Sequence, residues 1–172
     1  MQIVDNLSLE RRSFTIEAPP RVMRADHMRR SVCGNRSRRR EEAAVSRMTP
    51  YLCVRDARAA IDWYAAVLSA DVADGPFLMD DGRIGHVELD ADGARWMMAD
   101  PFPDLGVEAP DPTLATSVTL HLGVPDVDAV VAKAVDAGAS LDRSPEDGPG
   151  GRVAVFRDPF AHRWMLNGPG RA

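Results

Sequence analysis

The chain has few cysteines and no long apolar run. Only two cysteines, Cys33 and Cys53, occur in 172 residues, and their separate positions indicate no disulfide framework. All apolar runs are far shorter than the ~20 residues that a membrane-spanning helix needs. No apolar segment follows the N-terminus in the way that a secretory signal would require. We therefore expect a cytoplasmic protein without a membrane partner.

Positive charge is scarce after the first 47 residues. Residues 1–47 contain eleven arginines and six acidic residues, whereas residues 48–172 contain ten basic and twenty acidic residues. A net-acidic body does not suit nucleic-acid binding, because the phosphates are neutralised by clustered cations. We therefore expect no nucleic-acid partner.

Residues 1–47 show little apolar periodicity and carry the basic runs Arg29-Arg30 and Arg38-Arg39-Arg40. A segment with so little apolar content cannot offset the entropy of ordering, which predicts a disordered basic extension. Two other interpretations stay open. The segment is either a basic arm for a nucleic acid or a membrane surface, or a mis-assigned start, with Met48 as the native first residue. Residues 48–168 are predicted to form one domain, followed by a tail at 169–172.

The body of the chain repeats itself. Three short motifs recur in the same order, about seventy residues apart: Val54-Arg55-Asp56 with Val124-Pro125-Asp126, Gly82-Arg83-Ile84 with Gly151-Arg152-Val153, and Arg95-Trp96-Met97-Met98 with Arg163-Trp164-Met165-Leu166. This agreement indicates an internal duplication, with repeats over about 49–99 and 117–167. A stacked array needs three or more copies, so two copies favour a pseudo-dimer.

Each repeat has the pattern of one strand, one helix and three further strands. In the first repeat the strands are predicted at 51–54, 70–73, 85–89 and 94–98, with a helix capped by Asp56 and ending at 68. In the second they are predicted at 118–124, 140–143, 152–156 and 162–166, with a helix at 129–137 capped by Asp126 or Asp128. The predicted class is α+β. Two βαβββ modules pair into one curved eight-stranded mixed sheet, with the helices on its outer face and a concave ligand cleft on the other.

Strand alternation predicts which side chains line that cleft, because successive residues point to opposite faces of a sheet. The face away from the helices gathers six polar or amphipathic side chains, namely Tyr51, His86, Glu88, Arg95, His121 and Arg163. It also gathers three apolar ones, Met97, Phe156 and Met165. A few polar groups among apolar walls are typical of a small-molecule pocket. These nine residues are the predicted ligand-binding set.

A paired βαβββ unit with these motifs resembles the vicinal oxygen chelate superfamily, which includes glyoxalase I, extradiol dioxygenases and antibiotic-resistance binding proteins. The resemblance covers residues 49–167. Its carriers are Tyr51-Leu52-Cys53-Val54-Arg55-Asp56, Ala60-Ile61-Asp62-Trp63-Tyr64, and Asp158-Pro159-Phe160-Ala161-His162-Arg163-Trp164. Members usually have glycine where Ser69 and Ala161 stand here. The superfamily commonly pairs protomers, so the resemblance also implies a homodimer.

The resemblance places the usual metal ligands of the superfamily at Thr49, Met97, Thr119 and Met165. None of these side chains is a usual ligand for a divalent ion bound through imidazole and oxygen. No cofactor is therefore expected. One alternative is an offset divalent-metal site formed by His86, Glu88 and His121, which share the predicted open face.

Three functions fit these observations. The first is metal-independent binding of a small organic molecule, in which His86, His121, Arg95 and Arg163 favour an anionic or oxygen-rich ligand. The alternative is a lyase, isomerase or dioxygenase that uses the offset metal, or metal-free chemistry with Glu88 as the catalytic base. The third is an accessory domain with a vestigial cleft. The ligand and any reaction stay undetermined, since one fold serves many functions.

The domain boundary leads to a testable prediction. Deletion of residues 1–47 is expected to leave folding intact, because the repeats begin only at residue 49. Thermal melts of the truncated and full-length chains should coincide. A large fall in the melting temperature of the truncated protein would refute the boundary.

Overall fold

The computed structural model describes residues 47–171. The predicted basic extension at 1–47 lies outside the described residues except for Arg47, as does Ala172 in the predicted tail. Within the described range, none of the helices has the length and apolar character needed to cross a membrane.

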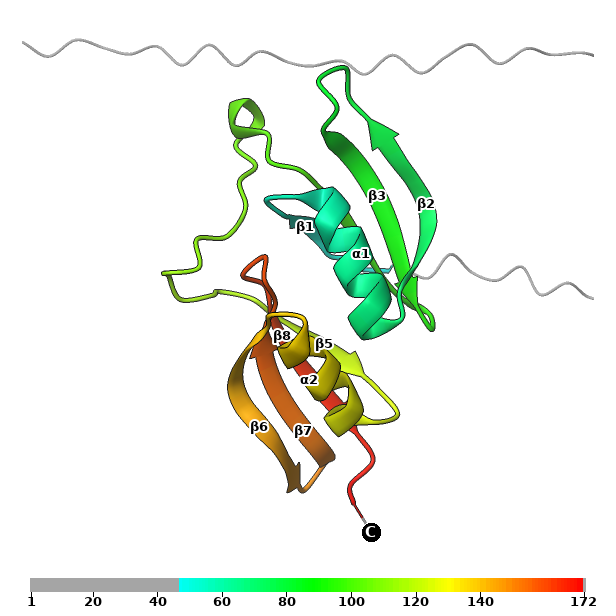
Figure 1. Ribbon diagram of the computed structural model, residues 1–172, viewed down its shortest axis with the longest axis vertical. Helices are drawn as coiled ribbons and strands as arrows, with labels where there is room; N and C mark the ends of the chain where they lie inside the picture. The colour runs from blue at the N-terminus through cyan, green and yellow to red at the C-terminus, as the bar shows by residue number, and fades with distance from the viewer. Residues whose placement is uncertain (1–46, 172) are drawn as a thin grey trace, which may run out of the picture. The chain divides into compact units, whose positions relative to one another are not determined.

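Both repeats fold as predicted, each with one strand, one helix and three more strands (Figure 1). The first module contains β1 (Tyr51–Cys53), α1 (Ala57–Leu68), β2 (Asp71–Leu78), β3 (Ile84–Ala91) and β4 (Ala94–Ala99). A connecting segment with a short 3-10 helix (Pro103–Leu105) leads to the second module. That module contains β5 (Thr119–Gly123), α2 (Val127–Asp136), β6 (Ser140–Gly148), β7 (Gly151–Arg157) and β8 (Arg163–Gly168).

The modules form two sheets with the same topology. Each sheet has four strands, in the orders β1-β4-β3-β2 and β5-β8-β7-β6, and the first strand of each module runs parallel to the last. The α+β class of two βαβββ modules is therefore confirmed. The strands lie in two four-stranded sheets, whereas the sequence predicted one continuous eight-stranded sheet.

Side-chain caps begin both helices. The Asp56 carboxylate accepts a hydrogen bond from the amide of Ala59 at 2.9 Å, and Asp126 accepts one from Ala129 at 3.0 Å. Each cap satisfies an amide that the first helical turn leaves without a partner. Ser69 ends α1 at φ 55°. A left-handed conformation costs a residue with a Cβ about 1 kcal/mol relative to glycine.

The apolar side chains of each sheet pack beneath the helices. In the first module Val87, Leu89, Trp96 and Met98 are almost completely buried, and in the second Ala154, Phe156, Trp164 and Leu166 are. Together with the buried faces of α1 and α2 they form a single core cluster. Burial of one face leaves the opposite face of each sheet to carry the polar side chains.

The prediction that Phe156 lies on the open face is wrong. Phe156 stands directly opposite Trp164 across β7 and β8, and residues directly opposite each other share a face. Its side chain is 0% exposed, and its ring centre lies 6.2 Å from that of Trp63. Residues 153–156 are all apolar, so alternation could not indicate which of them point inward.

A buried hydrogen-bonded joint connects the two modules. The Tyr64 hydroxyl on α1 donates to the Asp158 carboxylate at 2.6 Å, and the Trp164 indole donates to the same oxygen at 2.8 Å. Burial raises the pKa of Tyr64 well above its usual value, and the neighbouring Asp158 raises it further, so the hydroxyl keeps its proton. The Trp63 indole adds a second link, to the carbonyl of Ala137 just after α2, at 2.9 Å.

Replacing Tyr64 with phenylalanine is expected to lower the free energy of unfolding by about 1–3 kcal/mol, because the buried Asp158 carboxylate loses a donor. Chemical denaturation monitored by circular dichroism measures the change. The matched control is Tyr51→Phe, which removes the same hydroxyl from a side chain that is 51% exposed. That control should change stability by less than about 0.5 kcal/mol, and an equal effect of both variants would contradict the joint's importance.

Candidate functional site

A hollow of about 760 Å³ is lined by residues of both modules and of the connecting segment. Tyr51, Leu52 and Cys53 of β1 contribute to one side, and residues between 106 and 118 contribute to another. Leu120, His162 and Arg163 of the second module complete the lining. Most of these side chains are apolar, which is the usual composition of a small-molecule site.

Three polar groups in the hollow have defined surroundings. Burial raises the pKa of the Cys53 thiol, with further increases from Asp100 and Glu108. The thiol is therefore protonated at neutral pH and is a weak donor rather than a nucleophile. His162 Nε2 lies 3.1 Å from the Cys53 carbonyl oxygen, which links the final turn of the second module to β1.

Arg163 is held in place by neighbours from its own sheet. Its Nε donates to Asp142 at 2.9 Å and its Nη1 donates to the Thr119 hydroxyl at 2.7 Å. Among the residues that the structure describes, Nη2 has no protein acceptor. Arg163 therefore offers donors to the hollow from a guanidinium of fixed orientation.

Five of the predicted ligand residues lie on the open face of the first sheet, and Arg95 is the one at the start of β4. Tyr51, His86, Glu88 and Met97 occupy the strand positions that alternate with the buried core. The Tyr51 hydroxyl lies 3.0 Å from His86 Nδ1 and donates to the Gly85 carbonyl at 3.1 Å. Asp74 stands directly opposite Glu88, so its carboxylate joins the same face.

Arg95 and the remaining predicted residues lie away from the group around His86. Arg95 pairs with Asp90 at 2.7 Å and lines a separate depression beside Arg47. His121 and Met165 are paired neighbours on the second sheet. Tyr51 and Arg163 are the two members of the predicted set that line the hollow.

The offset metal site predicted from His86, Glu88 and His121 is not assembled in the described chain. The group that comes together is Asp74, His86 and Glu88, whose ligand atoms all lie within 4.8 Å of one another, and His121 is not part of it. The residues at the usual metal positions of the superfamily also do not fit an ion. Thr49, Met97, Thr119 and Met165 supply two hydroxyls and two thioethers in place of imidazole and carboxylate.

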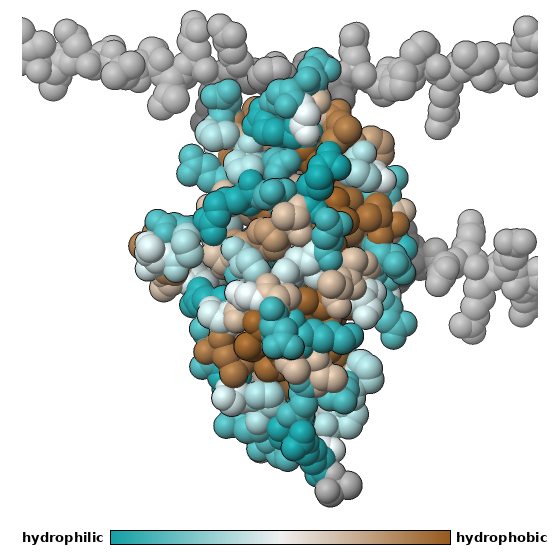
Figure 2. Space-filling model, viewed as in Figure 1, coloured by the Kyte–Doolittle hydropathy of each residue, from teal (hydrophilic) through white to brown (hydrophobic). Residues whose placement is uncertain are grey.

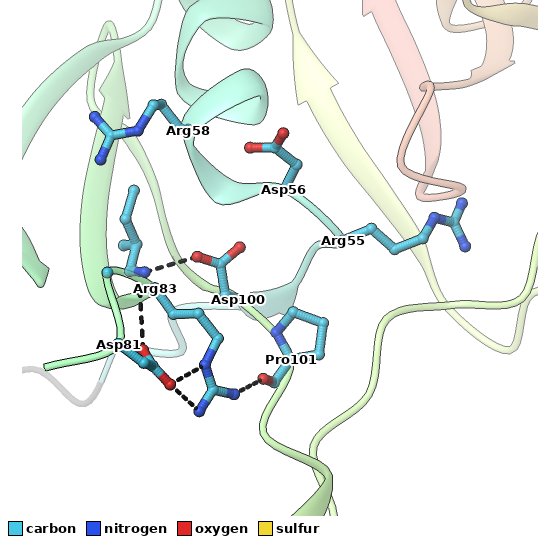
Figure 3. A pocket seen from close by; sticks show the side chains of 9 residues that line it. Arg55, Asp56, Arg58, Asp81, Arg83, Asp100 and Pro101 are labelled. Atoms are coloured by element: carbon cyan, nitrogen blue, oxygen red, sulfur yellow. Dashed lines mark hydrogen bonds and ion pairs between the residues drawn. The ribbon is translucent and has the colours of Figure 1, made fainter. Parts of the chain in front are cut away.

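A smaller depression of about 400 Å³ lies beside the start of α1 (Figure 3). Asp100 accepts hydrogen bonds there from the amides of Ala57 at 2.8 Å and Ile84 at 2.6 Å. Arg83 pairs with Asp81 at 2.6 Å and holds the pKa of that carboxyl below its usual value. Protein groups thus satisfy Asp81, Arg83 and Asp100 in this depression, and Asp100 links the end of β4 to the beginning of α1.

Sequence reasoning missed Asp74 and His162. The strand prediction stopped at Ala73 because Gly75-Pro76 is typical of a turn, whereas β2 continues to Leu78 through irregular pairing. His162 begins the last predicted strand and was not among the predicted ligand residues, yet it is half-buried and reaches β1. Arg95 and Arg163 occupy matching positions in the two repeats, which was a signal that both could contact a ligand. The fold shows that they line different depressions, and only Arg163 lines the hollow.

Comparison with known proteins gives relatives across the two modules. The family model described as the Glyoxalase/Bleomycin resistance protein/Dioxygenase superfamily matches residues 44–166. An uncharacterised protein of Mycobacterium tuberculosis is 39% identical over 128 residues, which is 72% of this chain and 75% of that relative.

Solved structures similar to this fold include the following two. TnmS3, an antibiotic binding protein from Streptomyces sp. CB03234, is 27% identical with a TM-score of 0.52, and the match covers 73% of this chain and 98% of that one. TioX from Micromonospora sp. ML1 is 26% identical with a TM-score of 0.54, and the match covers 70% and 94% of the two chains.

Proposed function

Because the chain belongs to the Glyoxalase/Bleomycin resistance protein/Dioxygenase superfamily, we propose that it binds a small organic molecule in the hollow. The observation that carries the proposal is the hollow itself, with its largely apolar lining and its few oriented polar groups. Its volume of about 760 Å³ lies in the range of ordinary ligand pockets. Binding there requires no metal ion, since apolar contact and hydrogen bonds supply the attraction.

The polar groups favour an anionic or oxygen-rich ligand. Arg163 presents guanidinium donors, and charge-assisted hydrogen bonds from such donors are about twice as strong as neutral ones. The Cys53 thiol and His162 add weaker polar contacts beside β1. Leu114, Val118 and Leu120 supply apolar contact. The antibiotic binding described for TnmS3 supports a ligand of drug-like size.

The proposal also includes a homodimer, supported by apolar side chains on the edge strand β2. Phe77 and Leu78 are 54% and 59% exposed, and Val72 and Met79 lie nearby in the chain. Figure 2 shows brown surface beside this part of the first sheet. Exposed apolar patches of this kind mark association surfaces.

Sedimentation analysis should give a mass of twice 18.8 kDa. A mass of one chain at every protein concentration would contradict this part of the proposal. A cytoplasmic location remains a prediction.

Ligand binding is tested by a thermal-shift screen of aromatic and anionic small molecules against the full chain. A ligand of the hollow should raise the melting temperature by mass action. Val118→Glu should abolish that rise for an anionic ligand, because Val118 lines the hollow and is 62% exposed, so the substitution places a repelling carboxylate in the hollow without disturbing the core. Arg163→Ala should weaken an anionic ligand by about tenfold or more.

The matched control is Arg95→Ala. Arg95 occupies the equivalent strand position of the first module and also pairs with an aspartate, but it lines a different depression. Its replacement should leave the ligand's affinity unchanged. Equal losses in the Arg95 and Arg163 variants, or an anionic ligand unaffected by Val118→Glu, would place binding outside the hollow.

A further inference from the structure

We propose that Asp74, His86 and Glu88 bind a divalent transition-metal ion of the zinc class on the open face of the first sheet. The three side chains each offer one ligand atom, and these atoms lie within 4.8 Å of one another. None of them occupies a position where the superfamily resemblance places a ligand, and none lines the hollow. The proposal is therefore independent of the proposed function.

The irregular pairing of β2 with β3 assembles the group. Asp74 stands opposite Glu88, and Phe77 stands opposite His86, with a register shift between the two pairs. Three steps along β2 therefore correspond to two steps along β3. Without the extra residue, Asp74 and Phe77 would point to opposite faces. The bulge keeps both on the open face, where Asp74 meets His86 and Glu88.

Tyr51 fixes the orientation of the imidazole. Its hydroxyl has one proton and lies 3.1 Å from the Gly85 carbonyl and 3.0 Å from His86 Nδ1; when the proton goes to the carbonyl, the hydroxyl accepts from a protonated Nδ1. In the neutral ring the lone pair then lies on Nε2. A metal-bound histidine commonly has its second nitrogen held by such a hydrogen bond.

The Nε2 atom faces carboxylates without bonding them directly. It lies 3.9 Å from Glu88 Oε1, which is beyond hydrogen-bond distance and leaves the two atoms free to share a ligand. Bonds of 2.0–2.2 Å to one tetrahedral ion would place two ligand atoms about 3.4 Å apart. The His86 and Glu88 atoms lie about 0.5 Å farther apart than that, and all three ligand atoms lie within 4.8 Å, so an ion would draw the side chains closer together. A cation also offsets the repulsion between Asp74 and Glu88, since like charges directly opposite in a sheet are destabilising.

The second module shows that the fold does not require these residues. Glu88 stands opposite Met97, and Val155 stands in the same way opposite Met165. Val153, two residues earlier, corresponds to His86. The same sheet face thus folds with valine at both positions. One imidazole and two carboxylates suit zinc and neighbouring first-row ions better than calcium or magnesium, which prefer all-oxygen sites.

The experiment titrates chelator-treated, full-length protein with Zn²⁺ by calorimetry. The expected result is one ion per chain with micromolar or tighter affinity at the site. The double variant His86→Val, Glu88→Val carries the side chains of the second module, and it should fold and lose about 100-fold or more in affinity at that site. Co²⁺ should give a visible absorption band in the wild type that the double variant lacks.

Three further variants complete the test. His121→Ala removes an exposed histidine from the other sheet and should bind Zn²⁺ as the wild type does. Tyr51→Phe should weaken binding by about 10–100-fold, because it releases the imidazole while keeping every ligand. If the double variant does not fold, Glu88→Gln, which preserves shape, takes its place. Equal Zn²⁺ binding by the wild type and the folded ligand variant, or no binding by either, would overturn the proposal.

Discussion

The hydrogen bond from Tyr64 to Asp158 is the contact on which the arrangement of the two modules depends. The sheets share no strand ladder, so the modules are held by side chains. The Asp158 carboxylate also accepts from the amides of Phe160 and His162, at 3.0 and 2.9 Å. The same buried group therefore shapes the turn before β8 and binds α1. That turn carries His162 to β1 and sets the edge of the hollow.

The two copies share a core but differ on their open faces. Leu89 opposite Trp96 corresponds to Phe156 opposite Trp164, and all four side chains are buried. On the other side, an imidazole and a carboxylate in the first copy correspond to two valines in the second. Packing constrains the inner positions tightly, because a close-packed interior tolerates few volume changes. The positions on the open face are free to differ. The proposed metal site uses such positions, and the proposed ligand site is the hollow beside them. Tyr51 lines the hollow and contacts His86 of the metal site.

The sequence predicts the order and type of the elements because each is encoded locally. Apolar spacing and a capping aspartate indicate each helix. Because the same order of elements is predicted in both repeats, each repeat supports the prediction for the other. Long-range details were not encoded in this way. Which face Phe156 occupies is set by its pairing with β8, because the apolar run around it does not alternate. The position of Asp74 is set by a bulge in β2, where the local sequence Gly75-Pro76 indicates a turn. The hollow is formed partly by the connecting segment between 106 and 118, whose path no periodicity describes.

Native-state hydrogen exchange tests most directly whether the buried joint makes the two modules one cooperative unit. Amides of β3 and β7 report on the centre of each sheet, and their exchange gives the free energy of opening for each module. If the joint makes the modules one unit, the free energy of opening and its denaturant dependence should be the same for both strands, as in a single all-or-none transition. A markedly lower free energy of opening in one module, with the other still protected, would contradict it.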